Sequence, residues 1–434
     1  MTDYFEFIEE LIRKGEKREP PLKGVRVVEV THFIFGPNIG RILAQFGAEV
    51  VKVETPGEGD RFRIAAVFGR FYKRANLVYA LLNANKYFVA ADARVERARK
   101  IIFELARKAD VFVENLRAGL ADAMGIGYSQ ISKVNPKIIY VSCSGYGQFG
   151  PLSRAPSFDV AAQGVSSVAT KTGWEDVDEF YKLPDYFGDY LPSMLATLAV
   201  LAALRYREKT GVGQYIDVSQ TECLLRFLYD ITYYSVTGEE VGKTGNLDPT
   251  MIPSGIFRTS DGKFVAVAAV NSEQRRRLAE LAGFGVDEDA KSQVEKLERW
   301  IESKSLEEVL ELAKQHGFSA APVLDDLEVT YDEWRRERGS VVEVNDRLLG
   351  RVLSVGPFAV FSATPGRIKW LGRPVGYHNR LILKRWLNLS DEMIDELEKE
   401  GAIGYWDEMP GCAPPTTWSE EEDEVFRGEK DEQG

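Results

Sequence analysis

The first part of the chain alternates between short apolar runs and an amphipathic stretch. The runs Val25–Val30 and Glu49–Glu54 are rich in β-branched residues, which favour strands. Between them, apolar residues recur at helical spacing from Gly36 and Pro37 to Gly47. Proline suits the first turn of a helix because its missing N–H has no partner there, and glycine is common just past a helix end. The pattern predicts a strand, a helix and a parallel strand, the repeating unit of doubly wound α/β sheets.

The alternation continues to about residue 225. Apolar runs typical of buried parallel strands recur at Tyr87–Asp92, Asp110–Glu114, Ile138–Ser142 and Gln214–Val218. Helical periodicity separates them, and the segment Asp189–Arg207 is long and rich in leucine and alanine. Ligands of such sheets bind beyond the carboxyl ends of the strands, which first occur at the sequence THFIFGP, residues 31–37. No G-x-G-x-x-G follows the first strand, which disfavours a nicotinamide or flavin cofactor.

After residue 225 the pattern changes. A Gly-, Thr- and Pro-rich stretch precedes two strand-like runs joined by a turn, and three helical segments follow. Strand-like pieces then return from Gly339 to Trp370 before a last helix. We therefore expect an α/β protein with a doubly wound, Rossmann-like large domain built from N- and C-terminal segments, and a smaller α+β domain. The expected ranges are 1–225 (large domain), 226–244 (linker), 245–335 (small domain), 336–415 (return segment) and 416–434 (tail).

The charge is concentrated at one end of the chain. The net charge is −12 for 434 residues, and the last fifteen residues contribute −6, with eight acids against Arg427 and Lys430. Such a segment predicts an acidic, solvated and disordered tail. The remainder is only mildly acidic and has no basic stripe, which argues against nucleic acid as a partner.

Cysteine usage and the N-terminus bear on the compartment. Cys143, Cys223 and Cys412 are too few for a disulfide framework and lack metal-ligand spacing, so no metal is expected. The N-terminus, residues 1–21, predicts an amphipathic helix that is first acidic and then basic. A secretory signal instead has a basic start followed by an apolar core. The longest apolar run, Leu191–Leu204, falls short of the roughly 18–20 residues that cross a bilayer. We expect a cytoplasmic protein without a membrane partner.

Eight collinear fragments resemble the class III CoA-transferase (CaiB/BaiF) family. The resemblance includes formyl-CoA transferase and carnitine CoA-transferase and, more distantly, α-methylacyl-CoA racemase. It extends over nearly the whole chain after residue 20. The fragments are LKGVRVVEVTHFIFGP (22–37), FGAEVVKVETPGEGD (46–60), NANK (83–86), VENLRAG (113–119), NPKIIYVSCSGYGQFGP (135–151), SFDVAAQG (157–164), GDY (188–190) with AALRYREKTGVGQYIDVS (202–219), and SATPGRIKWLGRPVGYHN (362–379).

The resemblance implies that Asp189 is a nucleophile. In the family, the aspartate of a Gly-Asp pair attacks an acyl-CoA to give an aspartyl-acyl anhydride, and returning CoA thiolate then gives an aspartyl-CoA thioester. An acceptor carboxylate finally takes over the CoA. A covalent route of this kind divides one hard exchange into easier steps. The local sequence allows another interpretation, in which Asp189 caps the N-terminus of its helix.

The resemblance also implies which residues contact CoA. The backbone of Phe33, Ile34 and Phe35 would lie along its pantetheine and adenine, and cations near the site would meet its phosphates. His32, in the same turn, lacks a nucleophile partner in sequence and is expected to be a structural hydrogen-bonding group. CoA is here a substrate, and no cofactor is expected. The other expected CoA contacts are Asn85, Lys86, Asn115, Leu116 and Arg117.

Three positions depart from the family pattern. Thr55 and Ala123 replace arginines of formyl-CoA transferases, and Arg61, Arg63 and Arg117 are candidates to compensate. Phe158 stands where the related racemases place a histidine, and because phenylalanine cannot accept a proton, transferase is favoured over racemase.

The substrates implied by the resemblance are an acyl-CoA and a carboxylic acid, and the implied assembly is an interlocked homodimer. Two alternatives to a transferase of this kind stay open. One is a CoA-ester racemase or isomerase. The other is a non-catalytic CoA-ester-binding subunit of a heteromeric transferase.

Overall fold

The chain divides into two compact units. The computed structural model describes residues 2–228, 230–248 and 250–433. The larger unit comprises Met1–Ser166, Pro184–Phe227 and Glu333–Gly434, and the smaller one Ser167–Leu183 and Leu228–Asp332. The corresponding boundaries expected from the sequence are at residues 225 and 335. Residues 167–183 are then expected in the large domain, whereas in the structure they group with the smaller unit.

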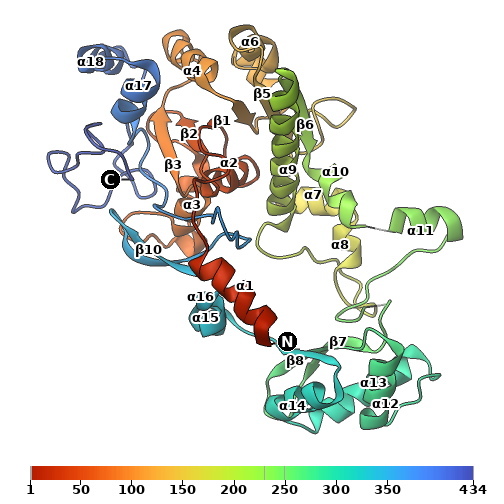
Figure 1. Ribbon diagram of the computed structural model, residues 1–434. Helices are drawn as coiled ribbons and strands as arrows, with labels where there is room; N and C mark the ends of the chain where they lie inside the picture. The colour runs from red at the N-terminus through yellow and green to blue at the C-terminus, as the bar shows by residue number, and fades with distance from the viewer. Residues whose placement is uncertain (1, 229, 249, 434) are drawn as a thin grey trace. The chain divides into compact units, whose positions relative to one another are not determined.

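A six-stranded parallel sheet forms the centre of the larger unit (Figure 1). Its spatial order is β3-β2-β1-β4-β5-β6. The strand order reverses between β1 and β4, which places the switch point at the carboxyl ends of these two strands. The predicted mixed α/β fold with a parallel sheet is confirmed. The strands are β1 (Arg26–Val30), β2 (Glu49–Glu54), β3 (Lys86–Ala90), β4 (Val111–Glu114), β5 (Ile139–Ser144) and β6 (Gln214–Ser219).

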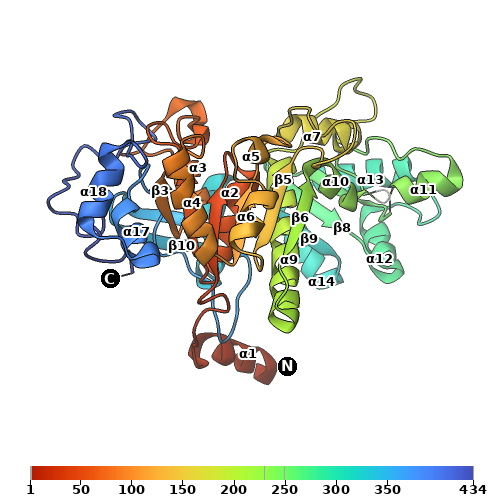
Figure 2. The ribbon, with the colours of Figure 1, turned by 90° about the horizontal axis from the view of Figure 1, so that it is seen from above.

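Helices cover both faces of this sheet (Figure 2). Val27 and the next residue, Val28, point to opposite faces and belong to different hydrophobic clusters. Burial on both faces explains why the strands are continuous apolar runs rather than alternating ones. One face packs on α2 (Phe35–Gln45) and α9 (Phe187–Thr210), and the other on α4 (Glu96–Lys108), α6 (Tyr128–Val134) and α17 (Asn379–Leu387).

Helix α9 is longer than the apolar run seen in the sequence. Within the described residues it is the one helix long and apolar enough, by length and composition, to cross a membrane. Half of its most apolar stretch is buried, and Ala196 and Val200 pack in the same cluster as Ile39 of α2. This is the packing of a core helix.

Other elements complete the larger unit, and two of them, strands β10 and β11, form an antiparallel hairpin. These elements are α1 (Thr2–Lys14), η1 (Arg61–Arg63), η2 (Val67–Gly69), α3 (Leu77–Leu82), α5 (Leu120–Ala123), α7 (Asp159–Val165), α10 (Gln220–Leu224), η3 (Leu225–Phe227), α16 (Glu333–Glu337), β10 (Val341–Asp346), β11 (Gly350–Val355) and α18 (Asp391–Lys399).

The smaller unit is built on a three-stranded antiparallel sheet with order β7-β8-β9. Its core contains Val265, Leu278, Leu297 and Ile301. Its elements are α8 (Val168–Lys171), α11 (Asp230–Thr237), β7 (Ser254–Arg258), β8 (Phe264–Ala268), α12 (Ser272–Ala282), α13 (Ala290–Glu302), α14 (Leu306–His316), β9 (Ser319–Pro322) and α15 (Asp326–Tyr331).

The acidic C-terminal segment differs from the disordered tail that its composition predicts. Val425 and Phe426 are buried in the same cluster as the sheet. The carboxylate of Glu432 lies against the buried guanidinium of Arg373, with Nη2 to Oε2 at 2.9 Å. Net charge alone predicts repulsion and disorder, but here the buried guanidinium of Arg373 compensates the charge of Glu432.

A buried charge cluster lies beneath the helix that follows β1. We use this name for Glu29, Lys52, Glu54, Asp60, Arg63 and Lys86, all of which are buried. Lys86 Nζ donates to Glu29 Oε1 at 2.7 Å, to Asn83 Oδ1 at 2.9 Å and to the Pro37 carbonyl at 2.7 Å. A side chain at Gly40 would place its Cβ 1.9 Å from Glu29 Oε2, so this glycine makes room for the carboxylate.

Substituting Lys86 tests the cluster's contribution to stability. Lys86→Met keeps the length of the side chain but removes the ammonium. We expect the free energy of unfolding to fall by about 3–5 kcal/mol, because Glu29 is then left as a buried carboxylate without its nearest cation. Chemical denaturation followed by tryptophan fluorescence measures the change.

The matched control is Lys14→Met on α1. It removes an exposed ion pair with Glu10, at 2.9 Å, and should leave the unfolding midpoint unchanged. Equal shifts of the midpoint in the two variants would contradict the prediction.

Candidate active site

The turn between β1 and α2 lies at the switch point and is clamped to the loop after β4. The backbone N–H of His32 donates to Asn115 Oδ1 at 2.7 Å, and Asn115 Nδ2 donates to the His32 carbonyl at 2.8 Å. A side chain at Gly36 would come within 3 Å of both Thr31 and Asn115, so glycine is required for this close approach. The two loops therefore form one rigid edge.

The buried charge cluster supports this turn from below. Lys52 Nζ donates to the Thr31 carbonyl at 2.7 Å and lies 3.2 Å from Asp60 Oδ2. Asp60 Oδ1 accepts from the Phe33 N–H at 3.0 Å. Phe33 has a φ of 59°, a left-handed conformation that costs free energy for a residue with a side chain. The Asp60 carboxylate thus helps to hold a strained backbone at the edge of the sheet.

The predicted CoA contacts in this turn and in the loop after β4 differ in how far their side chains are exposed. The side chains of Ile34 and Phe35 are buried in the core, and that of Phe33 is half-buried. Leu116 donates its N–H to Glu114 Oε2 at 2.8 Å, and Arg117 is exposed. Their contact with CoA stays a prediction.

Asn85 and Lys86 lie inside the protein. Asn85 donates to the Arg367 carbonyl at 2.7 Å and accepts from the Lys369 N–H at 2.7 Å, which fixes the C-terminal return segment. Lys86 is the cation of the buried cluster, and burial lowers the pKa of its ammonium to about 8. Whether either contacts CoA stays a prediction. Among the three compensating candidates, Arg63 pairs with Glu54, whereas Arg61 and Arg117 are exposed.

Asp189 lies in the first turn of α9, beside the β1–α2 turn. The helix begins at Phe187 with Tyr186 as its N-cap residue, so Asp189 is not the cap that the local sequence allows. The next residue, Tyr190, packs against the cluster that contains Phe33 and Ile34. Asn38 Nδ2 donates to Ser193 Oγ at 2.5 Å and joins the two helices one turn further along. The tertiary structure therefore brings the predicted nucleophile to the predicted CoA-binding turn.

The Asp189 carboxyl is half-buried and bound at one oxygen. Gln220 Nε2 donates to Asp189 Oδ1 at 2.6 Å, and Gln220 Oε1 in turn accepts from Ser157 Oγ at 3.1 Å. No described residue donates to Asp189 Oδ2. Burial and, to a smaller extent, the nearby Asp159 carboxyl together raise the pKa of Asp189 to about 7.

Asp159 positions the start of α9. Its Oδ1 accepts from the Gly188 N–H at 2.7 Å and from Gln163 Nε2 at 2.8 Å. A side chain at Gly188 would lie 2.9 Å from this carboxylate, which accounts for glycine before Asp189. Sequence reasoning missed the roles of Asp159 and Gln220. Asp159 stands in the SFDVAAQG fragment and Gln220 directly follows a predicted strand, so a signal existed for their location but not for their contacts.

Within the described residues, His32 and the acidic side chains do not form a second reactive site or a metal site. The backbone of His32 makes the clamp with Asn115, and burial lowers the pKa of its imidazole below the usual value. Within the described residues, no group of three or more His, Cys, Asp and Glu side chains could hold a metal ion.

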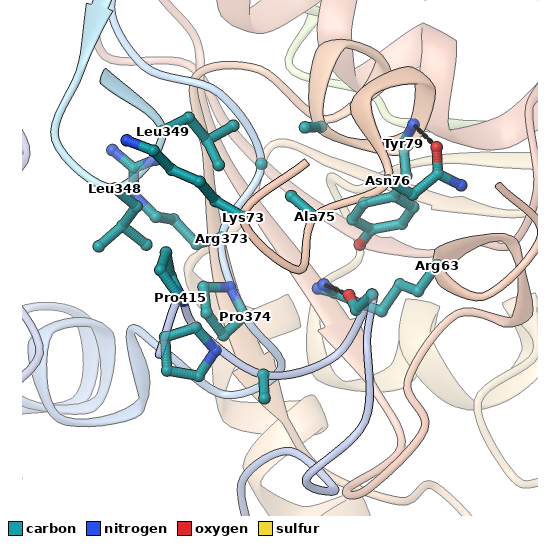
Figure 3. Close-up of a pocket in the computed structure, with 15 residues that line it drawn as sticks. Arg63, Lys73, Ala75, Asn76, Tyr79, Leu348, Leu349, Arg373, Pro374 and Pro415 are labelled. Atoms are coloured by element: carbon teal, nitrogen blue, oxygen red, sulfur yellow. Dashed lines mark hydrogen bonds between the residues drawn. The ribbon is translucent and has the colours of Figure 1, made fainter. Parts of the chain in front are cut away.

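A small pocket lies away from Asp189, between the turn at Ala75 and the C-terminal return segment (Figure 3). Its volume of about 20 Å³ is that of a single water molecule. Its polar side chains have protein partners: Asn76 caps α3, and Arg63 and Arg373 are in buried ion pairs. It is a packing gap and not a substrate site.

Comparison with known proteins agrees with the resemblance seen in the sequence. The family model "CoA-transferase family III" matches residues 22–379. Succinyl-CoA–D-citramalate CoA-transferase of Chloroflexus aurantiacus is 30% identical over 405 residues, which cover 90% of this chain and all of that protein. The beta subunit of succinyl-CoA–L-malate CoA-transferase of the same organism is 32% identical over 403 residues, 88% of this chain and 98% of that subunit.

The structural comparison points the same way. The crystal structure of a CaiB/BaiF family protein from Brucella suis has a TM-score of 0.74 and 28% sequence identity, and the match covers 85% of this chain and all of that one. Together with the family model and the relatives, this shows that the chain belongs to CoA-transferase family III and is a CoA-transferase.

Proposed function

We propose that the enzyme transfers CoA from an acyl-CoA to a carboxylic acid by covalent catalysis at Asp189. The observation that carries this proposal is the position of the Asp189 carboxyl. It is half-buried at the switch-point edge, held at Oδ1 by Gln220, and bears no hydrogen bond from the described residues at Oδ2. An oriented carboxylate with one unencumbered oxygen is suited to attack a thioester.

The reaction runs through three covalent intermediates, two aspartyl-acyl anhydrides and one aspartyl-CoA thioester. Asp189 Oδ2 attacks the thioester carbonyl, the C–S bond breaks, and CoA leaves as the thiolate with an aspartyl-acyl anhydride left behind. The thiolate attacks the aspartyl carbonyl and releases the donor acid, which gives an aspartyl-CoA thioester. The acceptor carboxylate attacks the carbonyl of this thioester, the C–S bond breaks, CoA leaves again as the thiolate, and a second aspartyl-acyl anhydride forms. The thiolate then attacks the acyl carbonyl of this new anhydride, and the bond between that carbonyl and the Asp189 oxygen breaks. Acyl-CoA is formed and the Asp189 carboxylate is restored.

The surrounding residues have separate tasks in this scheme. The Gln220 amide donates to the carboxyl that changes charge in every step, as an oxyanion donor does. The clamped backbone of Phe33, Ile34 and Phe35 would bind the pantetheine arm. Asn85, Lys86, Asn115 and Leu116 are proposed to shape the CoA site, and Arg117 to meet a phosphate. The strand order supports a Rossmann-like description of the large unit. An interlocked homodimer and a cytoplasmic location complete the proposal.

The alternatives differ in the groups that they need. A two-base racemase needs a proton acceptor opposite the aspartate, and Phe158 has none. A non-catalytic subunit needs no reactive carboxyl, whereas here a glycine, a glutamine and a second aspartate fix Asp189 in place.

The role of Asp189 is tested by trapping. With acyl-CoA present, hydroxylamine should convert Asp189 into the hydroxamate, because it cleaves anhydrides and thioesters, and peptide mass spectrometry detects the product. Asp189→Asn should lower CoA exchange at least roughly 10³-fold, since no covalent intermediate can form.

Asp185→Asn is the control for this substitution, because Asp185 is an exposed aspartate just before α9. It should exchange CoA like the unmodified enzyme. Full exchange by Asp189→Asn would rule out the covalent route.

The pH dependence follows from the raised pKa of Asp189. The nucleophile is the deprotonated form, so kcat/KM for acyl-CoA should rise with pH through about 7 and then level off. Asp159→Asn keeps the Oδ1 acceptor for the Gly188 N–H but removes a like charge. It should therefore lower the pKa of Asp189 and move the rise of kcat/KM to lower pH. A rate that is flat from about pH 5 to pH 9 in both enzymes is incompatible with this assignment.

Gln220→Leu tests the orienting hydrogen bond. We expect kcat to fall roughly 10- to 100-fold with little change in KM, because a bond to a charged group that acts throughout the reaction is lost. Steady-state kinetics measures both constants. Ser157→Ala should also lower kcat with little change in KM, but to a smaller degree, because it removes only the hydrogen bond that Ser157 donates to Gln220. An effect on KM alone would assign Gln220 to substrate binding.

A further inference from the structure

Four aromatic rings form a continuous series in the larger unit, which we call the aromatic arc. It consists of Phe158, Phe33, Phe62 and Tyr186. The rings of Phe33 and Phe158 pack edge to face with centroids 5.4 Å apart. The Phe62 ring lies 6.2 Å from both Phe33 and Tyr186. These distances are those of interacting aromatic pairs.

Both ends of the arc border Asp189. Tyr186 accepts the Asp189 N–H at its carbonyl, at 2.8 Å. Phe158 directly precedes Asp159, whose carboxylate accepts from the Gly188 N–H at 2.7 Å. The middle of the arc, Phe33, packs in the same cluster as Tyr190. The arc is therefore connected at both ends and in its middle to the first turn of α9, in which Asp189 lies.

The ends of the arc are exposed although they are large and apolar. The side chain of Phe158 is 59% exposed and that of Tyr186 is 43% exposed. Phe33 and Tyr186 also have left-handed backbones, with φ of 59° and 58°. Such a conformation is unfavourable for an aromatic residue and is found mainly where function requires it. The arc therefore combines exposed ring surface at its two ends with backbone strain at Phe33 and Tyr186.

The charges near the nucleophile do not match a second carboxylate on the substrate. In the described residues Asp189 forms no ion pair, and the charged group that acts on its carboxyl is another acid, Asp159. A dicarboxylate bound at Asp189 needs a cation for its distal end. The rings of the arc supply apolar surface instead.

We propose that the aromatic arc binds an aromatic ring on the acyl group, so that the enzyme uses an aryl-substituted carboxylic acid and its CoA ester. The exposed ring of Phe158 leaves a face free for another edge-to-face contact, which is the geometry that aromatic pairs favour. This proposal rests on the proposed function, because it places the acyl group on Asp189.

Isotope self-exchange tests the substrate class, because donor and acceptor are the same acid and the equilibrium is neutral. The full-length protein is incubated with phenylacetyl-CoA and deuterated phenylacetate, and separately with the succinyl and acetyl pairs. Mass spectrometry follows the label into acyl-CoA. We expect kcat/KM for the phenylacetyl pair to exceed that of the succinyl pair at least roughly tenfold. Faster exchange of the succinyl pair overturns the proposal.

Phe158→Ala tests the arc itself. It should lower the ratio of phenylacetyl to acetyl exchange roughly tenfold, because one ring contact and its buried area are lost. The control is Phe358→Ala, which removes a ring that is 74% exposed and pairs edge to face with Phe46 at 5.3 Å. It should leave the ratio unchanged. An unchanged ratio in Phe158→Ala overturns the role of the arc.

The outcomes separate this proposal from the proposed function. If only the substrate class is wrong, succinate exchange is the faster and is lost in Asp189→Asn. If the function is wrong, no pair exchanges label or the exchange persists without Asp189. Exchange that prefers the phenylacetyl pair and requires both Asp189 and Phe158 supports both.

Discussion

The structure depends on a set of charges that cannot reach water. Lys52 and Lys86 extend from adjacent strands beneath the β1–α2 turn, and each donates to a backbone carbonyl of the segment 31–37 as well as interacting with carboxylates. Burial alone would raise the pKa of Glu54, but the guanidinium of Arg63 outweighs it and lowers the pKa to about 2. A buried charge without its partner is strongly destabilising, so each member fixes the positions of the others.

This constraint explains how a strained turn persists. Phe33 has a left-handed backbone whose N–H is bound by Asp60, and Asp60 is itself fixed by Lys52 and by the Phe62 N–H. Strain of this kind survives only where the surroundings over-determine it. The same turn contributes a ring to the aromatic arc and the backbone proposed to bind CoA. The β1–α2 turn therefore connects the buried charge cluster, which stabilises the fold, to the proposed CoA-binding site.

Asp189, the proposed nucleophile, is held differently, by neutral and like-charged groups. Gln220 binds one oxygen of Asp189, whereas Asp159 binds the backbone just before it and, in addition to burial, raises the pKa of the Asp189 carboxyl. An ion pair would lower the pKa and weaken the carboxylate as a nucleophile, because basicity and nucleophilicity change together. Orientation without neutralisation is what a carboxylate that must form covalent bonds requires.

The sequence by itself determined the parallel α/β sheet. Strands buried on both faces must be apolar throughout, and that signal is local. Eight collinear fragments identified the family and the aspartate of the Gly-Asp pair. The disorder that composition predicts for the C-terminal segment was wrong, because net charge does not show that the buried Arg373 forms an ion pair with Glu432.

Only the tertiary structure decided which residues meet. Contact of Lys86 and Asn85 with CoA stays a prediction, whereas only the fold shows that Lys86 forms an internal ion pair and that Asn85 binds the return segment. Gln220 is 31 residues from Asp189 in sequence, and their hydrogen bond exists because β6 places α10 beside the start of α9. Periodicity reports how each segment is buried, but partners distant in sequence are chosen by packing. That choice is made by the whole fold.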